Sequence, residues 1–252
     1  FKQWWPQTAG DGITKYQRLE RWFNMLATAY AGKKYTLKYA LISSSDPAMT
    51  PMDDLVGKTA APVVTDASTN VTDWTEEDCM TWYIRATALS LADGTMNVTY
   101  IEGEDGFDIS GESAPVYTFS LALWLKEWDD ENENYKSWAT INPGDYWPYE
   151  GDISPTNVKR AMTWHPTFSG GLTSDGKLTS GAGLASAIEI SAVSGLAKAK
   201  LWNTYEGLWN DCDAKWLLDM WQLKHFNLEN SGIVTGCISY SAEAIVSVAE
   251  TA

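Results

Sequence analysis

Two short stretches of the chain place aromatic rings beside hydrogen-bond acceptors. The first is DYWPYEGD, residues 145–152, and the second is WNTYEGLWNDCD, residues 202–213. The faces of Trp and Tyr rings stack on sugar rings and on protein loops, while Asp and Asn accept hydrogen bonds from hydroxyl groups. This pattern predicts a ligand-binding site rather than a catalytic site. The candidate ligand-binding residues are Tyr146, Trp147, Tyr149, Trp202, Asn203, Tyr205, Trp209, Asn210 and Asp211.

Catalytic arrangements are harder to assemble from this sequence. The chain has two histidines, His165 and His225, and no G-x-S-x-G elbow that would present a serine nucleophile. We expect His225 to be a core or boundary residue of an apolar helix, and His165 to form hydrogen bonds in a loop shaped by Pro166. We therefore predict no catalytic residue.

Glycoside hydrolysis stays open as an alternative, because it needs only two carboxyl groups at a suitable separation. An acidic chain offers such pairs by chance, so their number is weak support. The carboxylates that we consider are Glu127, Asp145, Glu150, Glu206, Asp211 and Asp213.

Metal-binding motifs are also missing, because the sequence contains no H-E-x-x-H, H-x-H or EF-hand pattern. Asp129, Asp130, Glu131 and Glu133 form an acidic cluster that offers oxygen ligands of the kind calcium prefers. The cluster lacks the glycine of an EF-hand loop, and solvated charges at a hairpin tip are the simpler interpretation. We predict no cofactor and keep calcium as the alternative.

The composition excludes several classes of partner. The 252 residues carry a formal net charge of −15, and such a surface repels both nucleic-acid phosphates and anionic membranes. No apolar run reaches the ~18 residues of a membrane-spanning helix. Cys79, Cys212 and Cys237 form no C-x-x-C pair, so we favour buried thiols over one disulfide with a free thiol. The chain begins with Phe1, and we expect it to be processed or part of a longer protein.

Helical and strand patterns alternate along the chain. Apolar residues three and four apart predict an amphipathic helix over residues 14–31, which ends at Gly32. Hairpins are predicted around Asp93-Gly94 and Asp175-Gly176, and strands over residues 116–128 and 135–141. Asp213 is expected to cap a buried helix that runs to about Glu229, with Trp216 and Trp221 in the core. Residues 233–240 and 244–250 then predict short closing strands.

These elements predict an α+β fold, β-rich, with an N-terminal amphipathic helix and a buried helix near the C-terminus. We expect a single domain over residues 1–252. Within it, residues 1–35 are considered as a helical arm and residues 145–252 as a C-terminal ligand-binding lobe.

One segment resembles a known group of proteins. WLLDMWQLKHFNLENSGIVTGCISY, residues 216–240, is similar to the closing segment of phage and prophage structural proteins of gut bacteria. The shared features are the aromatic helix Trp216 to Phe226, the Asn230-Ser231 turn, Gly236-Cys237 and Tyr240, and residues 50–68 have a similar character. The final residues, SAEAIVSVAETA, depart from that pattern. The resemblance implies a virion surface or tail-fibre component, with a C-type-lectin-like fold at the C-terminal end.

Our leading hypothesis is therefore a non-enzymatic phage or prophage virion protein. It would be a tail-fibre or receptor-binding part that attaches to a bacterial cell-surface glycan or protein. We expect a homotrimer that assembles with other virion proteins and is located in the virion or outside the cell. A secreted carbohydrate-binding module or glycoside hydrolase is one alternative, and a structural capsid or tail component is another.

Overall fold

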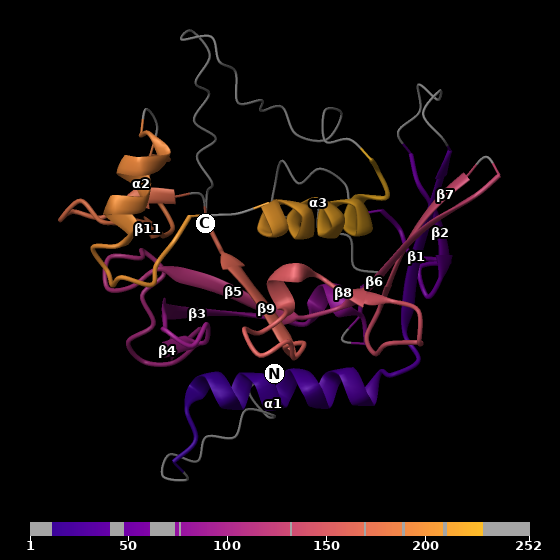
Figure 1. The fold of residues 1–252 in the computed structure, drawn as a ribbon, viewed down its shortest axis with the longest axis horizontal. Helices are drawn as coiled ribbons and strands as arrows, with labels where there is room; N and C mark the ends of the chain where they lie inside the picture. The colour runs from indigo at the N-terminus through magenta and orange to yellow at the C-terminus, as the bar shows by residue number, and fades with distance from the viewer. Residues whose placement is uncertain are drawn as a thin grey trace, which may run out of the picture.

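The computed structural model describes residues 12–40, 48–60, 74–75, 77–131, 133–168, 170–187, 190–208 and 211–228. These residues form an α+β fold, β-rich, with three antiparallel sheets, one N-terminal helix and two helices toward the C-terminus (Figure 1). The predicted fold class is confirmed at this level. The predicted closing strands and the part of the virion-like segment that follows residue 228 lie outside the described residues.

The largest sheet has the strand order β2-β1-β7-β6-β8. Its strands are β2 (Thr50–Asp53), β1 (Lys34–Ala40), β7 (Glu133–Ala139), β6 (Trp124–Asp130) and β8 (Trp147–Pro148). The second sheet has the order β4-β3-β5-β9. It consists of β4 (Met96–Ile101), β3 (Tyr83–Ser90), β5 (Val116–Leu121) and β9 (Met162–Pro166). A small hairpin pairs β10 (Gly170–Leu172) with β11 (Leu178–Ser180).

Helix α1 (Lys15–Ala29) begins one residue later and ends two residues earlier than the predicted helix. Thr14 caps it, because its hydroxyl accepts from the Gln17 backbone while the Gln17 side chain accepts from the Thr14 backbone. The buried face, which includes Leu19 and Phe23, packs against β4, β5 and β9. Figure 1 shows the helix along one side of the four-stranded sheet.

The predicted hairpins form at the expected turns. Gly94, between β3 and β4, and Gly176, between β10 and β11, both have positive φ angles, at 74° and 83°. The run predicted as one strand over residues 116–128 divides instead. Ala122 and Leu123 are buried between β5 and β6, where the chain passes from the four-stranded to the five-stranded sheet.

Two 3-10 turns and one further α-helix also belong to the described fold. A 3-10 turn, η3 (Glu150–Asp152), follows β8, and a second one, η2 (Cys79–Thr81), precedes β3. Helix α2 (Ala192–Ala199) packs on β11. No helix in the described ranges has both the length and the apolar character needed to cross a membrane.

Helix α3 (Asp211–His225) is the predicted C-terminal helix, with two corrections. Asp213 lies within its first turn rather than at the cap, because the helix already begins at Asp211. The helix is also less uniformly apolar than predicted. Trp216 and Leu223 are buried, but Leu218 is 48% exposed and the polar residue Asp219 is fully buried.

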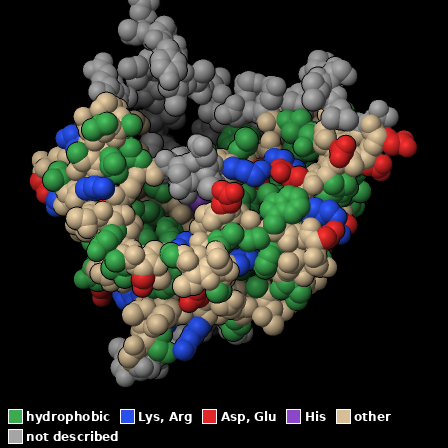
Figure 2. Space-filling view, viewed as in Figure 1, with side chains coloured by type: hydrophobic (Ala, Val, Ile, Leu, Met, Phe, Trp, Pro, Cys, Tyr) green, Lys and Arg blue, Asp and Glu red, His purple; other side chains and the backbone are tan. Residues whose placement is uncertain are grey.

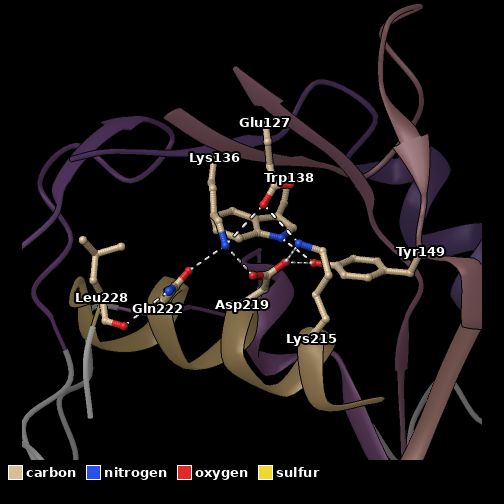
Figure 3. A network of polar contacts seen from close by, with 8 residues as sticks. All are labelled: Glu127, Lys136, Trp138, Tyr149, Lys215, Asp219, Gln222 and Leu228. Carbon is tan, nitrogen blue, oxygen red and sulfur yellow. Dashed lines mark hydrogen bonds and ion pairs between the residues drawn. The ribbon is translucent and has the colours of Figure 1, made fainter. Parts of the chain in front are cut away.

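A polar network holds α3 against the five-stranded sheet (Figure 3). Lys136 of β7 donates to Asp219 Oδ1 at 2.8 Å and to Gln222 Oε1 at 3.0 Å. Tyr149 donates to the other oxygen of Asp219 at 2.7 Å and accepts a hydrogen bond from Trp138 Nε1 at 2.8 Å. Each buried polar group thereby gains a partner, and this satisfies the main condition for burying charge.

The pKa directions agree with this geometry. Burial works against the charged form of Lys136, but Asp219 and Glu127 outweigh it and raise the pKa of the ammonium group. Burial and the neighbouring Asp219 raise the pKa of Tyr149, so its hydroxyl stays a proton donor. Lys215 and Glu127 close the outer edge of the network with an ion pair at 3.1 Å.

We predict that Asp219→Ala lowers the free energy of unfolding by ~3–5 kcal/mol, because it leaves Lys136 buried without its main counter-charge. The neighbouring exposed residue provides the control: Leu218→Ala should change stability by less than ~0.5 kcal/mol. Urea denaturation of both variants measures the difference. Similar small losses in the two variants would contradict a structural role for the network.

Candidate functional site

In the first of the two aromatic stretches, residues 145–152, one aromatic ring is exposed to solvent. Trp147 is 43% exposed and lies opposite Leu125 at the edge of the five-stranded sheet. Tyr146 is buried and donates to Ser137 Oγ at 2.8 Å, so it belongs to the core instead of the predicted ligand face. Tyr149 is buried as part of the network described above, although it also borders a pocket.

The second stretch forms a compact turn before α3. Trp202 is half-buried and donates to the Leu178 carbonyl at 2.8 Å. Asn203 accepts from the backbone of Tyr205 and Glu206 and donates to the Ser90 carbonyl, so its polar groups shape the turn. Tyr205 is 56% exposed.

The remaining candidates of this stretch are only partly placed. Trp209 and Asn210 lie outside the described residues. Asp211 begins α3, but its side chain is not among those described.

The two stretches meet at a pocket of about 250 Å³, which we call the carboxylate pocket. Tyr149 borders it from the first stretch and Glu206 from the second. The space-filling view shows a hollow on this side of the molecule, between the part that carries α2 and the main body (Figure 2). The residues that line the pocket are Ser90, Tyr117, Tyr149, Gly151, Asp152, Arg160, Thr163, Trp164, His165, Pro166, Glu206, Gly207, Leu208 and Trp216.

Asp152 is the most unusual group in this pocket. Its side chain is 1% exposed, and its Oδ2 atom has no hydrogen-bond partner among the described residues. Burial raises the pKa of the carboxyl group, while Lys159, a hydrogen bond with Thr163, His165 and Arg160 oppose that rise. A buried acid with an unsatisfied oxygen destabilises the fold, and such groups concentrate at functional sites.

Lys159 has the complementary perturbation. Burial lowers its pKa to about 8, and the nearby Asp152 only partly offsets that effect. Its ammonium group donates to the carbonyl of Ala122 at 2.6 Å and to that of Arg160 at 3.1 Å. The ammonium group of Lys159 is therefore bonded to two backbone carbonyls.

Thr163 and His165 extend the polar chain from Asp152 along β9. The Thr163 hydroxyl lies 3.2 Å from His165 Nε2, and the His165 ring stacks on Trp216 of α3 with 3.9 Å between ring centroids. His165 is thus a buried residue of a strand, whereas the sequence predicted a loop position. The error arose because Pro166 ends a strand here instead of shaping a turn.

Glu206 supplies the second carboxyl group. It is buried, and it accepts from the Ser90 backbone at 2.6 Å and from the Tyr117 hydroxyl at 2.8 Å. These bonds orient the carboxylate between β3, β5 and the turn built by Asn203. Glu206 was among the carboxylates considered from the sequence, whereas Asp152 was present in the first stretch without being singled out.

A second pocket, of about 410 Å³, adjoins the first and is mostly apolar. We call it the apolar pocket. Pro115, Leu178 and Ala199 border it, and α2 and the β10–β11 hairpin supply part of its wall. The sequence indicated a small exposed hairpin here but gave no sign of a cavity beneath it.

Several other predicted residues can be placed. Trp216 is buried, as predicted, and Trp221 is half-buried against His225, with 4.1 Å between the ring centroids. His225 is a buried helical residue, as predicted.

The acidic cluster does not assemble a metal site. Asp129 and Asp130 end β6, Glu131 forms the turn with φ 51°, and Glu133 pairs with Lys38 at 3.0 Å. Within the described ranges, no group of three His, Cys, Asp or Glu side chains is arranged to hold a metal ion.

The raised pKa of Asp152 makes its effect on stability depend on pH. Folding favours the protonated form, so the contribution is complete below the ordinary value of 3.8 and is lost as pH rises through the folded pKa. We predict that wild type loses stability relative to Asp152→Asn as pH rises above the ordinary value of 3.8, until the folded carboxyl group is fully ionised. Urea denaturation at several pH values measures this, and a pH-independent difference would contradict it.

Comparison of the chain with protein-family models, with curated proteins and with solved structures finds no match.

Proposed function

We propose that this chain is a non-enzymatic phage or prophage virion protein, a tail-fibre or receptor-binding part that attaches to a bacterial surface glycan or protein. The observation that carries the proposal is the carboxylate pocket, which the buried carboxyl groups of Asp152 and Glu206 border together with aromatic side chains. A buried acid with an incompletely bonded carboxyl group lowers the stability of the fold, and such groups concentrate at functional sites.

The resemblance of residues 216–240 to phage structural proteins supports the virion part of the proposal. The described portion of that segment supplies Trp216, which borders the carboxylate pocket. We extend the proposal to a homotrimer that assembles with other virion proteins and is located in the virion or outside the cell. From the same resemblance we propose a C-type-lectin-like arrangement at the C-terminal end.

Trp147 is proposed as a second contact with the receptor. It is the exposed ring of the first stretch, and an exposed Trp offers a large, rigid contact face at low entropic cost. It lies at a sheet edge and takes no part in the hydrogen bonds that hold Tyr146 and Tyr149 in the core.

We predict that Trp147→Ala and Glu206→Gln each weaken binding of fluorescently labelled protein to receptive bacterial cells by about tenfold or more, in line with the loss of an interface anchor. Trp147→Ala should keep wild-type thermal stability, since its ring is exposed. Tyr83→Ala, which removes another exposed ring from β3, is the matched control and should bind normally.

Flow cytometry over a panel of gut bacteria gives the readout. If wild type binds no cell and instead assembles into larger particles, the structural capsid or tail alternative replaces the attachment proposal. If Tyr83→Ala loses as much binding as Trp147→Ala, the loss does not locate a receptor face.

A glycoside hydrolase is the second candidate, and one observation favours it. Asp152 and Glu206, both buried, border the same pocket, and the raised pKa of Asp152 suits a general acid while the oriented Glu206 carboxylate suits a base or nucleophile. Sugar release from a polysaccharide panel by wild type, abolished in both Asp152→Asn and Glu206→Gln, would replace the non-enzymatic proposal with this one.

A further inference from the structure

The outer face of α2 carries apolar side chains where polar ones are expected. Gly195 and Ala199, four residues apart, are buried where the helix packs on β11. The opposite side of the helix presents Val193, Leu196 and Ala197 to solvent, and Val193 is 80% exposed. A surface helix of a soluble protein usually turns its polar side outward. The apolar outer face of α2 therefore indicates a surface that binds another molecule.

The surroundings of this face are basic. Residues 190–205 contain two lysines, Lys198 and Lys200, and no acidic residue. Lys200 is exposed and lies on the same side of the helix as Val193, because seven residues complete about two turns. Leu201 follows the C-cap and is 58% exposed. The α2 face, as we call it, consists of Val193, Leu196, Ala197, Lys200 and Leu201.

A surface of complementary chemistry lies at the tip of the hairpin that β6 and β7 form. Asp129, Asp130 and Glu131 are exposed there. Next to them, Trp128 and Tyr135 form a cross-strand pair whose rings stack with 4.9 Å between centroids. Both residues are half-buried, so part of their aromatic surface is open to a partner. We call these five residues the hairpin tip.

The α2 face and the hairpin tip lie at opposite ends of the molecule (Figure 1). In the space-filling view, acidic side chains gather over the end that carries the β6–β7 hairpin, while hydrophobic and basic side chains are exposed over the end that carries α2 (Figure 2). One chain cannot bring its own two surfaces together, so each of them is left for another molecule.

The charge of the chain decides which partner suits the α2 face. With a formal net charge of −15 each, two copies repel one another over most of their surfaces. Attraction between copies requires that a basic patch of one meets an acidic patch of the other, and apolar side chains on both sides then add contact area. Two α2 faces would instead bring Lys200 against Lys200. An anionic membrane is disfavoured by the acidic remainder of the chain.

We infer that the α2 face of one copy binds the hairpin tip of a second copy of this chain. Val193 and Leu196 pack against the stacked aromatic pair, and Lys200 faces the acidic side chains. The contact is heterologous, because the two surfaces differ, and such contacts either close into a ring or continue as an open chain. This inference rests on the homotrimer of the proposed function, for which it names the contact between subunits.

Sedimentation velocity of the full chain at increasing concentration tests the inference. One helix face on one hairpin tip makes a small interface, so we expect a dissociation constant on the order of 10 µM. Val193→Asp should weaken association by about tenfold or more, and an acidic side chain in the first turn suits the helix dipole, so the helix should stay folded. Val158→Asp changes a 63% exposed valine outside both surfaces and is the matched control.

Charge reversal tests the pairing of the two surfaces. Lys200→Glu and Asp130→Lys should each weaken self-association by about tenfold, since each variant places like charges across the contact. An equimolar mixture of the two variants should associate within about threefold of wild type, because the reversed α2 face of one variant meets the reversed hairpin tip of the other. All the substituted residues are exposed, so thermal melts of the variants should match that of wild type.

Three results would overturn the inference: wild type that stays monomeric, Val193→Asp that associates like wild type, or a mixture of charge-reversed variants that stays dissociated. Monomeric wild type that sediments with phosphatidylcholine vesicles, when Val193→Asp does not, would assign the α2 face to a membrane instead.

The same experiment separates the inference from the proposed function. A trimer that survives Val193→Asp would leave the homotrimer standing without this contact. Species that grow with concentration and disappear in Val193→Asp would support the contact and replace the homotrimer with an open chain. Attachment to bacterial cells is measured separately by flow cytometry, so its loss in wild type would count against the attachment proposal alone.

Discussion

The buried contact between Lys136 and Asp219 is the interaction on which the arrangement of the site depends. It joins the middle of the five-stranded sheet to α3, and Tyr149 binds the same carboxylate from the segment that follows β8. Because Asp219 is fully buried, neither partner could remain charged without the other at acceptable cost. The contact thereby fixes how α3 lies on the sheet, and α3 in turn places Trp216 against His165.

The carboxylate pocket differs from the α3 network in how completely its buried polar groups are hydrogen-bonded. In the α3 network each donor and acceptor finds a partner, whereas Asp152 keeps an oxygen without one among the described residues. The α3 network and the carboxylate pocket lie close together, since Tyr149 belongs to the network and also borders the pocket. A network in which the buried groups are hydrogen-bonded therefore lies directly beside an incompletely bonded acid.

Local signals in the sequence predicted much of the fold. The Thr14 cap and the apolar spacing of α1, and the glycine turns at Gly94 and Gly176, depend on neighbouring residues, so they can be recognised without knowing the fold. The candidate site was predicted less well. Tyr146 proved to be a core residue because Ser137 of the neighbouring strand β7 accepts its hydroxyl hydrogen bond, and that strand pairing is not visible in the sequence. The division between β5 and β6 also escaped prediction, since alternation continues across the change of sheet.

The sequence by itself determined the acidic character, the aromatic and acidic composition of the two stretches, and most of the helices and turns, because these follow from residue type and short-range geometry. Only the tertiary structure decided that Asp152 and Glu206 border one pocket, that Trp216 covers His165, and that an apolar cavity adjoins them. The physical reason is that each of these relations joins residues far apart in the chain. Their proximity is set by sheet pairing and by the buried Lys136–Asp219 contact, and neither leaves a pattern that a single sequence reveals.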